Sequence, residues 1–274
     1  MTATTADAPV RSPLSPRQRA RRGRIIQYVV LALVVVLAVM FVDGRQVADA
    51  FFRPSVIART IGPALAQALL NTVIYTIGGF IFGLLLGTVL GLMRLSSVAP
   101  NRWLAGIYIE FFRGVPALIV FMVFSLLPLA VPGLRIPFDP YGAVWLALGL
   151  VAAAYMAETI RAGIQAVPKG QLEAARSMGM PFGMATRKIV LPQAFRIVTP
   201  PLTNELILLT KDSSLVYVIG LTGSAYELTT YGRELATTTS NLTPLVVCGL
   251  TYLVITLPLT FLVRRMEAQA SKAR

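Results

Sequence analysis

Long apolar stretches alternate with short polar ones along almost the whole chain. A helix needs about 20 mostly apolar residues to cross the roughly 30 Å of hydrocarbon in a bilayer. Stretches of about this length lie at residues 25–42, 66–93, 115–131, 141–165, 195–220 and 243–263. The pattern therefore predicts an all-α integral membrane protein with about six transmembrane helices.

The composition narrows the possible functions. Of 274 residues, 55% are hydrophobic and only 14% are charged. The net charge is +13, but the basic residues lie between apolar runs, which excludes the clustered basic surface that nucleic-acid binding needs. There is no histidine and only one cysteine, Cys248, which lies in an apolar run. A His or Cys metal site, a Cys-His nucleophile pair and an intrachain disulfide are thereby excluded.

The distribution of Lys and Arg predicts the orientation. A basic tail, residues 1–24, precedes the first span, and loops between the spans on the same side hold most of the remaining Lys and Arg. By the positive-inside rule this side is the cytoplasm. We therefore expect residues 1–24 to form a disordered basic cytoplasmic tail and residues 268–274 to form a second cytoplasmic tail.

The first span admits two interpretations. A basic segment precedes it, and Ala48-Asp49-Ala50 resembles a signal-peptidase site, so residues 25–42 could be a cleaved signal peptide. However, the apolar run is longer than the usual hydrophobic region of a signal peptide. We expect a retained, additional N-terminal transmembrane helix.

A polar loop, residues 168–192, separates the fourth and fifth spans. Proline and glycine interrupt this loop repeatedly, which predicts two short helical segments joined by a turn, an elbow at the membrane face. Gly179 permits a turn with positive φ, and the paired alanines allow a partner surface to approach closely. The motif has the spacing E-A-A-x3-G-x9-I-x-L-P and consists of Glu173, Ala174, Ala175, Gly179, Ile189, Leu191 and Pro192.

This spacing resembles the coupling loop of permease subunits of ATP-binding-cassette (ABC) importers. Residues 64–267 as a whole are similar to the polar amino acid permeases, the histidine/glutamine/arginine permease-like family. The blocks that carry the similarity are residues 67–72, 110–116, 154–163 and 209–215. The resemblance implies a type I ABC importer transmembrane domain with a cytoplasmic coupling helix. Such a domain moves a polar amino acid or a similar small zwitterion across the bacterial inner membrane by alternating access. Two departures are the additional N-terminal span and Val115, where many relatives have threonine.

The resemblance also implies partners. The chain has no G-x-x-x-x-G-K-[ST] loop, so the energy must come from a separate subunit. We expect two copies of an ABC ATPase subunit, which bind ATP-Mg, and no cofactor or enzymatic activity on this chain. A solute-binding protein outside the cell would deliver the substrate. A second permease subunit, identical or different, would complete the pathway within membrane lipid.

Polar residues in the fifth span are candidates for the substrate pathway, because ionisable groups are costly in hydrocarbon and must face protein or water. Lys211 and Asp212 offer both charges that complement a zwitterion. Alternatively, they neutralise each other and hold spans together. Glu158 in the fourth span has a similar alternative as a partner of Arg161 at i+3. The candidate pathway residues are Asn71, Glu158, Asn204, Glu205, Lys211, Asp212, Ser213 and Ser214.

Two further features have more than one interpretation. Gly79, Gly83, Gly87 and Gly91 form a stripe along one helix face, for packing against another span of the chain or against another subunit. Residues 110–116 read as an interfacial turn in which Arg113 stays with water or phosphate.

Two other functional classes remain as alternatives to an importer permease. An autonomous ion-coupled carrier or channel would need no docking loop, and such proteins usually show repeated motifs, which we do not find in the sequence. An intramembrane enzyme would have to rely on Glu158, Glu205 or Asp212 alone, because the chain has no histidine.

Overall fold

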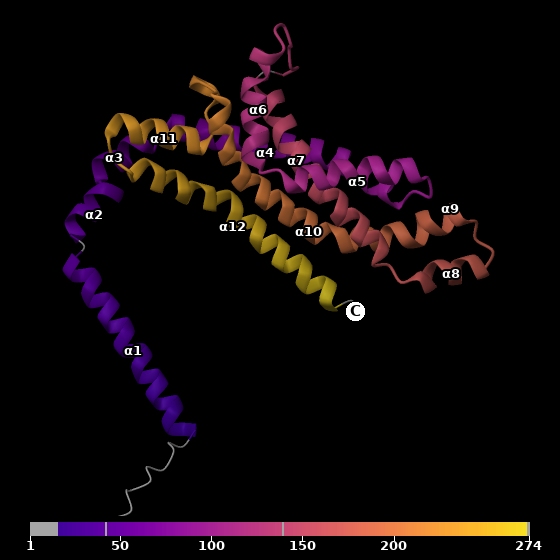
Figure 1. The fold of residues 1–274 in the computed structure, drawn as a ribbon, viewed down its shortest axis with the longest axis horizontal. Coiled ribbons are helices and arrows are strands. Elements are labelled where there is room, and N and C mark those ends of the chain that lie inside the picture. Colours follow the sequence, from indigo (N-terminus) through magenta and orange to yellow (C-terminus); the bar gives the residue numbers. More distant parts are fainter. Residues whose placement is uncertain (1–15, 42, 139, 273–274) are drawn as a thin grey trace, which may run out of the picture. The chain divides into compact units, whose positions relative to one another are not determined.

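The computed structural model describes residues 16–41, 43–138 and 140–272, and every regular element in these ranges is a helix (Figure 1). The chain divides between Phe51 and Phe52 into two compact units. The all-helical fold expected from the sequence is confirmed.

The first unit contains two helices, α1 (Pro16–Phe41) and α2 (Gly44–Phe51). The apolar side chains of α1 are exposed, as a helix meant for lipid requires. The prediction of a disordered tail up to residue 24 is wrong for residues 16–24, which are helical. Five of these nine residues are arginine, which favours helix, so they continue the helix formed by the apolar run. Residues 1–15 of the expected tail lie outside the described residues.

The second unit contains the remaining helices. The α-helices are α3 (Pro54–Thr60), α4 (Pro63–Leu95), α5 (Ala99–Gly114), α6 (Ala117–Ala130), α7 (Tyr141–Gln165), α8 (Lys169–Ser177), α9 (Phe182–Ala185), α10 (Leu191–Asp212), α11 (Leu228–Thr239) and α12 (Thr243–Lys272). A π-helical segment, η1 (Thr186–Val190), precedes α10, and two 3₁₀ segments, η2 (Ser213–Ile219) and η3 (Gly223–Ala225), follow it.

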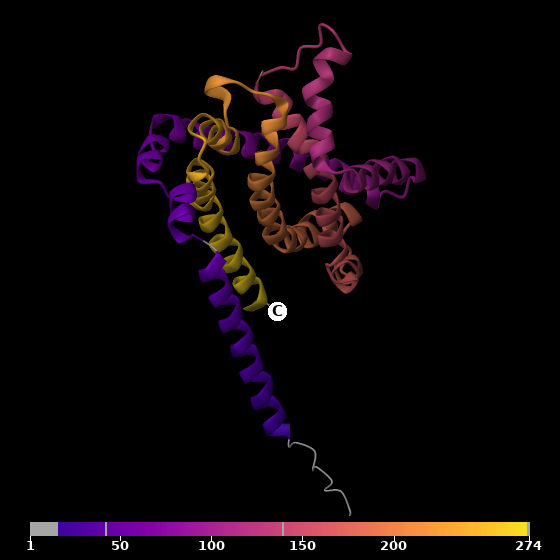
Figure 2. The same ribbon diagram turned by 60° about the vertical axis from the view of Figure 1, so that its left-hand side comes forward.

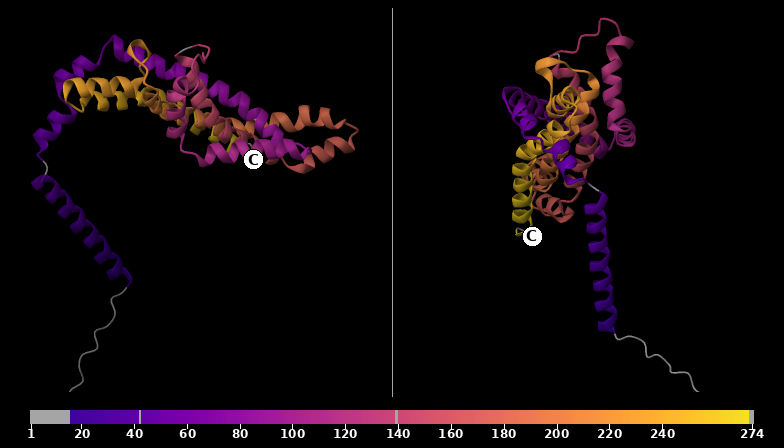
Figure 3. Two further views of the ribbon diagram at one scale, coloured as in Figure 1. Left: turned by 45° about the horizontal axis from the view of Figure 1, so that its top comes forward. Right: turned by 90° about the vertical axis from the view of Figure 1, so that its left-hand side faces the viewer.

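Fewer helices than the expected six can cross a membrane by their own length and composition. In the described residues there are four, within α1, α4, α7 and α12. A fifth arises if α5 and α6 count as one broken span, although they meet at 98°, and Figures 2 and 3 show α6 rising steeply from the end of α5. The expected third span is thus only the short helix α6, because Pro116 follows Gly114 and ends α5. The expected fifth span is α10 followed by η2, and α10 carries four charged residues.

The interface between α4 and α7 is the most extensive in the second unit, and the glycine stripe forms it. A Cβ on Gly79 would lie 2.7 Å from Cβ of Leu148, and one on Gly87 would lie 2.9 Å from the carbonyl oxygen of Ala153. The stripe therefore serves packing within the chain, which lets the two backbones approach closely.

The helix α10 packs on α7 as well, and runs in the opposite direction. Gly163 near the end of α7 lies against Val198 near the start of α10, where a Cβ on the glycine would overlap Cγ1 of the valine. Leu148 and Leu209 belong to one buried cluster, together with Tyr75 of α4 and Phe121 of α6. Four helices thus meet around the C-terminal end of α10.

Candidate functional site

The predicted elbow is present between α7 and α10, where α8 and α9 lie beyond the ends of these two helices (Figure 1). Gly179 has φ +86° and ends α8. The N–H of Met180 donates to the carbonyl of Ala175 at 3.1 Å, and the N–H of Gly179 donates to that of Arg176 at 3.0 Å. These two bonds form a Schellman motif, whose left-handed position favours glycine. The spacing from the alanine pair to Gly179 in the motif is therefore the spacing of a helix end.

The two alanines of the motif have different environments. Ala175 is buried at 2% exposure, so it packs within the elbow, whereas Glu173 and Ala174 are exposed. Large apolar side chains next to them are exposed too, with Met178 at 75% and Phe182 at 61%. Exposed apolar residues gathered on a polar loop favour a protein contact. The geometry thus offers Glu173 and Ala174, but not Ala175, to a partner.

The second half of the motif joins the elbow directly to α10. Thr186–Val190 are π-helical, and the N–H of Leu191 donates to the carbonyl of Thr186. Pro192 has no N–H, so the ordinary helical bond at its position cannot form, and the wider turn precedes it. Ile189 is half-buried, and Leu191 is 43% exposed. No loop separates the elbow from α10.

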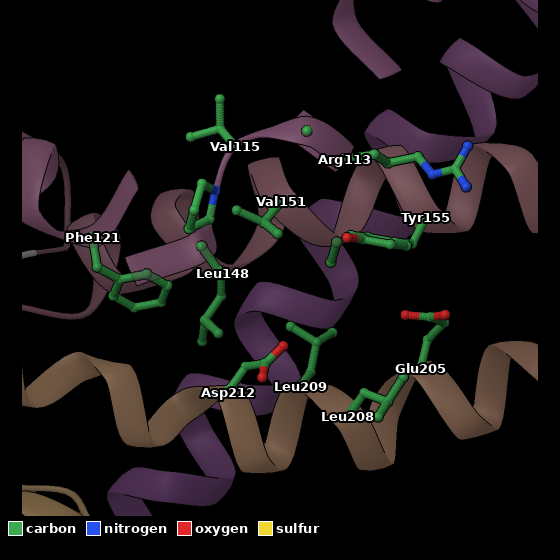
Figure 4. A pocket seen from close by; sticks show the side chains of 14 residues that line it. Arg113, Val115, Phe121, Leu148, Val151, Tyr155, Glu205, Leu208, Leu209 and Asp212 are labelled. Carbon is green, nitrogen blue, oxygen red and sulfur yellow. The ribbon is translucent and has the colours of Figure 1, made fainter. Parts of the chain in front are cut away.

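A cavity of about 430 Å³ lies among α7, α10 and the turn between α5 and α6 (Figure 4). Its polar wall residues are Arg113, Tyr155, Glu205 and Asp212. The rest of the wall is mainly apolar, and comprises Gly114, Val115, Pro116, Ala117, Phe121, Leu148, Val151, Ala152, Leu208 and Leu209. The cavity thus combines charges of both signs with an apolar lining.

In the described residues, none of the charged groups of the cavity forms an ion pair, although Asp212 is next to Lys211 in sequence. Among the described residues, neither Glu205 nor Asp212 accepts a hydrogen bond or forms an ion pair. The guanidinium of Arg113 lies over the ring of Tyr155, 5.9 Å from its centroid, and makes no hydrogen bond in the same ranges. Charged groups in a partly apolar cavity favour a ligand that pairs with them.

The register of α7 and α10 places these groups at two levels. Glu205 and Asp212 are seven residues apart, about two turns, and therefore lie on the same face of α10. Figure 4 shows both carboxylates pointing toward α7, Glu205 below Tyr155 and Asp212 below Leu148. The Gly163–Val198 contact gives the same order, because the helices run antiparallel from that point.

Glu158 is paired rather than free. Its Oε2 accepts from Nη2 of Arg161 at 2.6 Å and from Nε at 3.1 Å, and its Oε1 lies 3.8 Å from Nε of Arg94 on α4. Glu158 is thus a partner of Arg161 at i+3, the alternative to a role in the substrate pathway, and it does not line the cavity.

Asn71 also has a clear structural environment. It is fully buried, and its Nδ2 donates to the carbonyls of Ser224 at 2.6 Å and Tyr226 at 2.8 Å. The residue fastens the η3 segment to α4. A buried amide with satisfied donors stabilises such a connection.

The other candidate pathway residues lie around α10. Asn204 and Lys211 are exposed and are not part of the cavity wall. Ser213 is buried, and its hydroxyl donates to the carbonyl of Thr210 at 2.7 Å. Ser214 is half-buried in η2. The structure therefore brings together Glu205 and Asp212, but neither Lys211 nor Asn204 joins them.

Sequence reasoning missed two polar groups of the cavity. We expected Arg113 in an interfacial turn, but the sharp bend after Gly114 returns it to α7. Tyr155 enters the sequence analysis only as part of residues 154–163, one of the blocks similar to the polar amino acid permeases. The available signal was the Gly114-Val115-Pro116 break, which turns a charged helix end inward.

Comparison with known proteins gives a consistent result. Residues 79–272 match the family described as "Binding-protein-dependent transport system inner membrane component". The arginine transport system permease protein ArtQ of Bacillus subtilis is 40% identical over 207 residues, which cover 75% of this chain and 91% of ArtQ. The glutamate/aspartate import permease protein GltK of Escherichia coli O157:H7 is 36% identical over 217 residues, covering 76% of this chain and 94% of GltK.

A solved structure of an amino acid ABC transporter with histidines is also similar. One of its chains is 36% identical and superposes with a TM-score of 0.67, covering 76% of this chain and 94% of that one. The family match over residues 79–272 contains both the elbow and the cavity-lining helices α7 and α10. This chain therefore belongs to the family of inner-membrane components of binding-protein-dependent transport systems, as a permease subunit of an ABC importer.

Proposed function

We propose that the chain is the translocation subunit for a polar amino acid in the bacterial inner membrane. The observation that carries this proposal is the cavity, in which Arg113 and two carboxylates face a common space and form no ion pair with the described residues. An amino acid has a carboxylate and an ammonium, which complement these charges. The names of the relatives support the same class of substrate, since ArtQ is an arginine permease and GltK a glutamate/aspartate permease.

The elbow is the docking site for a separate ATPase in this proposal. It presents Glu173, Ala174 and exposed apolar side chains on a rigid helix end. The ATPase subunits, two per complex, bind ATP-Mg, and this chain binds no cofactor and hydrolyses no ATP. The elbow and both termini lie in the cytoplasm, in keeping with the basic residues around them.

The continuous path from the elbow to α10 suggests how energy reaches the substrate. When the ATPase subunits close, they displace α8 and α9, and η1 passes this displacement to α10 without an intervening loop. Because α10 carries Glu205 and Asp212, its movement against α7 alters the cavity walls and its opening. This is alternating access by movement of packed helices. A solute-binding protein delivers the substrate from outside, and a second permease subunit completes the pathway.

The test is purification of the tagged chain from native membranes and reconstitution of the complex in liposomes. We expect an ATPase subunit to co-purify, and uptake of a polar amino acid to require ATP inside and liganded binding protein outside. Glu173→Lys should reduce ATPase recovery and uptake together. Glu267→Lys, an exposed carboxylate near the end of α12, is the matched control and should reduce neither. Transport by the chain alone, without ATP, would establish the ion-coupled carrier in its place.

A further inference from the structure

We propose that the basic start of α1, residues 17–24, is a binding site for anionic phospholipids, whose headgroup phosphates pair with its arginines. The inference goes beyond the proposed function, because it concerns the membrane around the chain and not the substrate. Only the leaflet, the cytoplasmic one, rests on the proposed function, which assigns the N-terminal end to that side.

The first argument is the charge of this segment. It holds five arginines within eight residues, and α1 contains no Asp, Glu or Lys. All five side chains are exposed, and none forms an ion pair with another described residue. The five are Arg17, Arg19, Arg21, Arg22 and Arg24. A cluster of this size immediately beside a membrane span is typical of segments that bind anionic lipids.

The second argument is the depth of the arginines in the membrane. The apolar part of α1, residues 25–41, is about 25 Å long and crosses most of the roughly 30 Å of hydrocarbon. Arg24 therefore lies at the edge of the hydrocarbon, and the headgroup layer beyond it is about 5–7 Å thick. Along the helix axis, Arg21 is about 5 Å from Arg24, whereas Arg17 is about 10 Å from it. The arginines nearest the apolar part thus lie at the level of the lipid phosphates, and Arg17 lies at the outer edge of the headgroups.

The third argument is the distribution of the charges around the helix axis. At about 100° per residue, Arg17, Arg21 and Arg24 lie on one side of α1. Arg19 and Arg22 lie on the opposite side. A protein partner contacts one face of a helix, whereas lipid headgroups surround a membrane-spanning helix. The arrangement therefore favours lipids over a single protein surface.

The helix is also accessible to lipid on all sides. Every side chain of α1 that the structure describes is exposed. The six large apolar side chains within residues 25–31 are 51–69% exposed. Acyl chains can therefore lie along this part of α1 while the headgroups of the same lipids reach the arginines.

The chemistry of the headgroup decides which lipids bind. A guanidinium pairs with two oxygens of a phosphate through its planar fork. Phosphatidylcholine has a phosphate too, but its own ammonium group neutralises that charge and is repelled by the arginines. Phosphatidylglycerol has a net negative charge and no cation. We therefore expect a preference for phosphatidylglycerol that weakens as salt screens the charges.

The experiment measures which lipids gather at this segment. A fluorophore is attached to Ala20→Cys in a chain with Cys248→Ser, since Cys248 is the only other cysteine. The full chain, with the subunits that co-purify, is placed in phosphatidylcholine nanodiscs that contain a spin-labelled quencher lipid. The quencher has either a phosphatidylglycerol or a phosphatidylcholine headgroup. Both leaflets hold the same lipids, so the result depends neither on orientation nor on transport.

We expect half-maximal quenching at an about fivefold or more lower fraction of phosphatidylglycerol than of phosphatidylcholine, because one arginine near the surface already contributes about this factor. Raising the salt from 0.1 M to 1 M shortens the Debye length from about 10 Å to about 3 Å and should reduce the preference.

Paired variants test the depth argument. Arg22→Gln with Arg24→Gln should lower the preference severalfold, and Arg17→Gln with Arg19→Gln should lower it less, because these two arginines lie farther from the phosphates. Arg22→Lys with Arg24→Lys retains both charges and should keep most of the preference; it repeats the test if the glutamine pair does not insert. Arg264→Gln with Arg265→Gln, two exposed arginines near the end of α12, is the matched control and should leave the quenching at Ala20 unchanged.

The outcomes distinguish this inference from the proposed function. Equal quenching by the two lipids, or an equal effect of the control pair, would overturn the lipid site. A fluorophore that neither lipid reaches once other subunits are bound would assign the arginines to a protein contact instead. ATP-driven uptake of a polar amino acid is measured separately, and its presence or absence leaves the lipid preference untouched.

Discussion

Gly163 of α7 lies directly against Val198 of α10, and the valine side chain fills the place that a Cβ on the glycine would take. The contact sets the antiparallel register of the two helices. Counted from this contact along the two helices, Tyr155 of α7 lies opposite Glu205 of α10, and Leu148 of α7 lies opposite Asp212 of α10 (Figure 4). A glycine distant from the cavity thus determines which residues face each other across it.

Replacement of Gly163 should therefore disturb both stability and the cavity. In Gly163→Ala the new Cβ would overlap Val198, whose branched side chain has little rotamer freedom, so α10 must shift. We expect a loss of about 1–3 kcal/mol in unfolding free energy, measured by thermal unfolding in detergent. Val198→Ala in the same chain should recover part of this loss. Gly249→Ala, where the added Cβ meets no atom within 4 Å, is the control, and an equal loss there would contradict the argument.

The end of α8 depends on glycine for a different reason. Gly179 has open space around it but a φ of +86°, so Gly179→Ala is strained by its backbone alone. The left-handed conformation costs a residue with a Cβ about 1–2 kcal/mol, which lowers the ratio of intact to disrupted elbow about fivefold to thirtyfold. We expect ATPase binding and substrate-stimulated ATP hydrolysis to fall accordingly. Gly183→Ala, in the same elbow with open space and no positive φ, should have little effect; equal effects would show that bulk rather than conformation matters.

Glu158 is predicted to contribute to stability rather than to substrate binding. Glu158→Gln removes the charge that holds Arg161 and Arg94, and leaves these two cations close together. Hydrogen bonds to charged groups contribute about 1.5–3 kcal/mol, so we expect a loss of that order in thermal unfolding. Adding Arg161→Gln should cost less than the sum of the single changes. Normal stability combined with lost amino acid uptake would instead assign Glu158 to the pathway.

The sequence predicted those parts of the fold that depend on apolar length. Residues 141–165 were expected as a span and form α7 with the same bounds, since a long apolar run has few other solutions in a membrane. The elbow was also predictable, because Gly179 and the prolines act through their own backbone. The path of the chain after α5 was not, since Gly114 and Pro116 indicate a break but do not determine the 98° angle between α5 and α6.

The same distinction holds for the cavity. Ionisable groups are costly in hydrocarbon, which identifies Glu205, Lys211 and Asp212 as candidates. This cost does not determine in which direction each side chain points. Lys211 is next to Asp212 in sequence and therefore about 100° away around α10, outside the wall that Asp212 helps to form. Arg113 takes the place expected for Lys211. The sequence indicates the break that follows Arg113, but only the packing of this turn on α7 brings the side chain to the cavity.

The N-cap of α11 predicts how stability changes with pH. Glu227, the N-cap residue of α11, is fully buried. Its carboxylate accepts hydrogen bonds from the N–H groups of Thr229 at 2.5 Å and Thr230 at 2.6 Å, and from the hydroxyl of Tyr252 at 3.0 Å. Burial nevertheless raises the pKa of Glu227 above its usual value of 4.5, against the effect of these hydrogen bonds.

Above pH 4.5 the folded state therefore holds this proton more firmly than the unfolded state does, so stability decreases as pH rises. The contribution is fully present below pH 4.5 and is lost as pH passes the raised pKa of Glu227. One proton gives a slope of at most about 1.4 kcal/mol per pH unit. We expect the slope of unfolding free energy between pH 4.5 and neutrality to be shallower in Glu227→Gln than in the unchanged protein. The variant should also lose about 0.5–2 kcal/mol at every pH, because its amide satisfies fewer N-cap donors. Identical slopes would mean that the four donors around Glu227 keep it ionised in the folded protein.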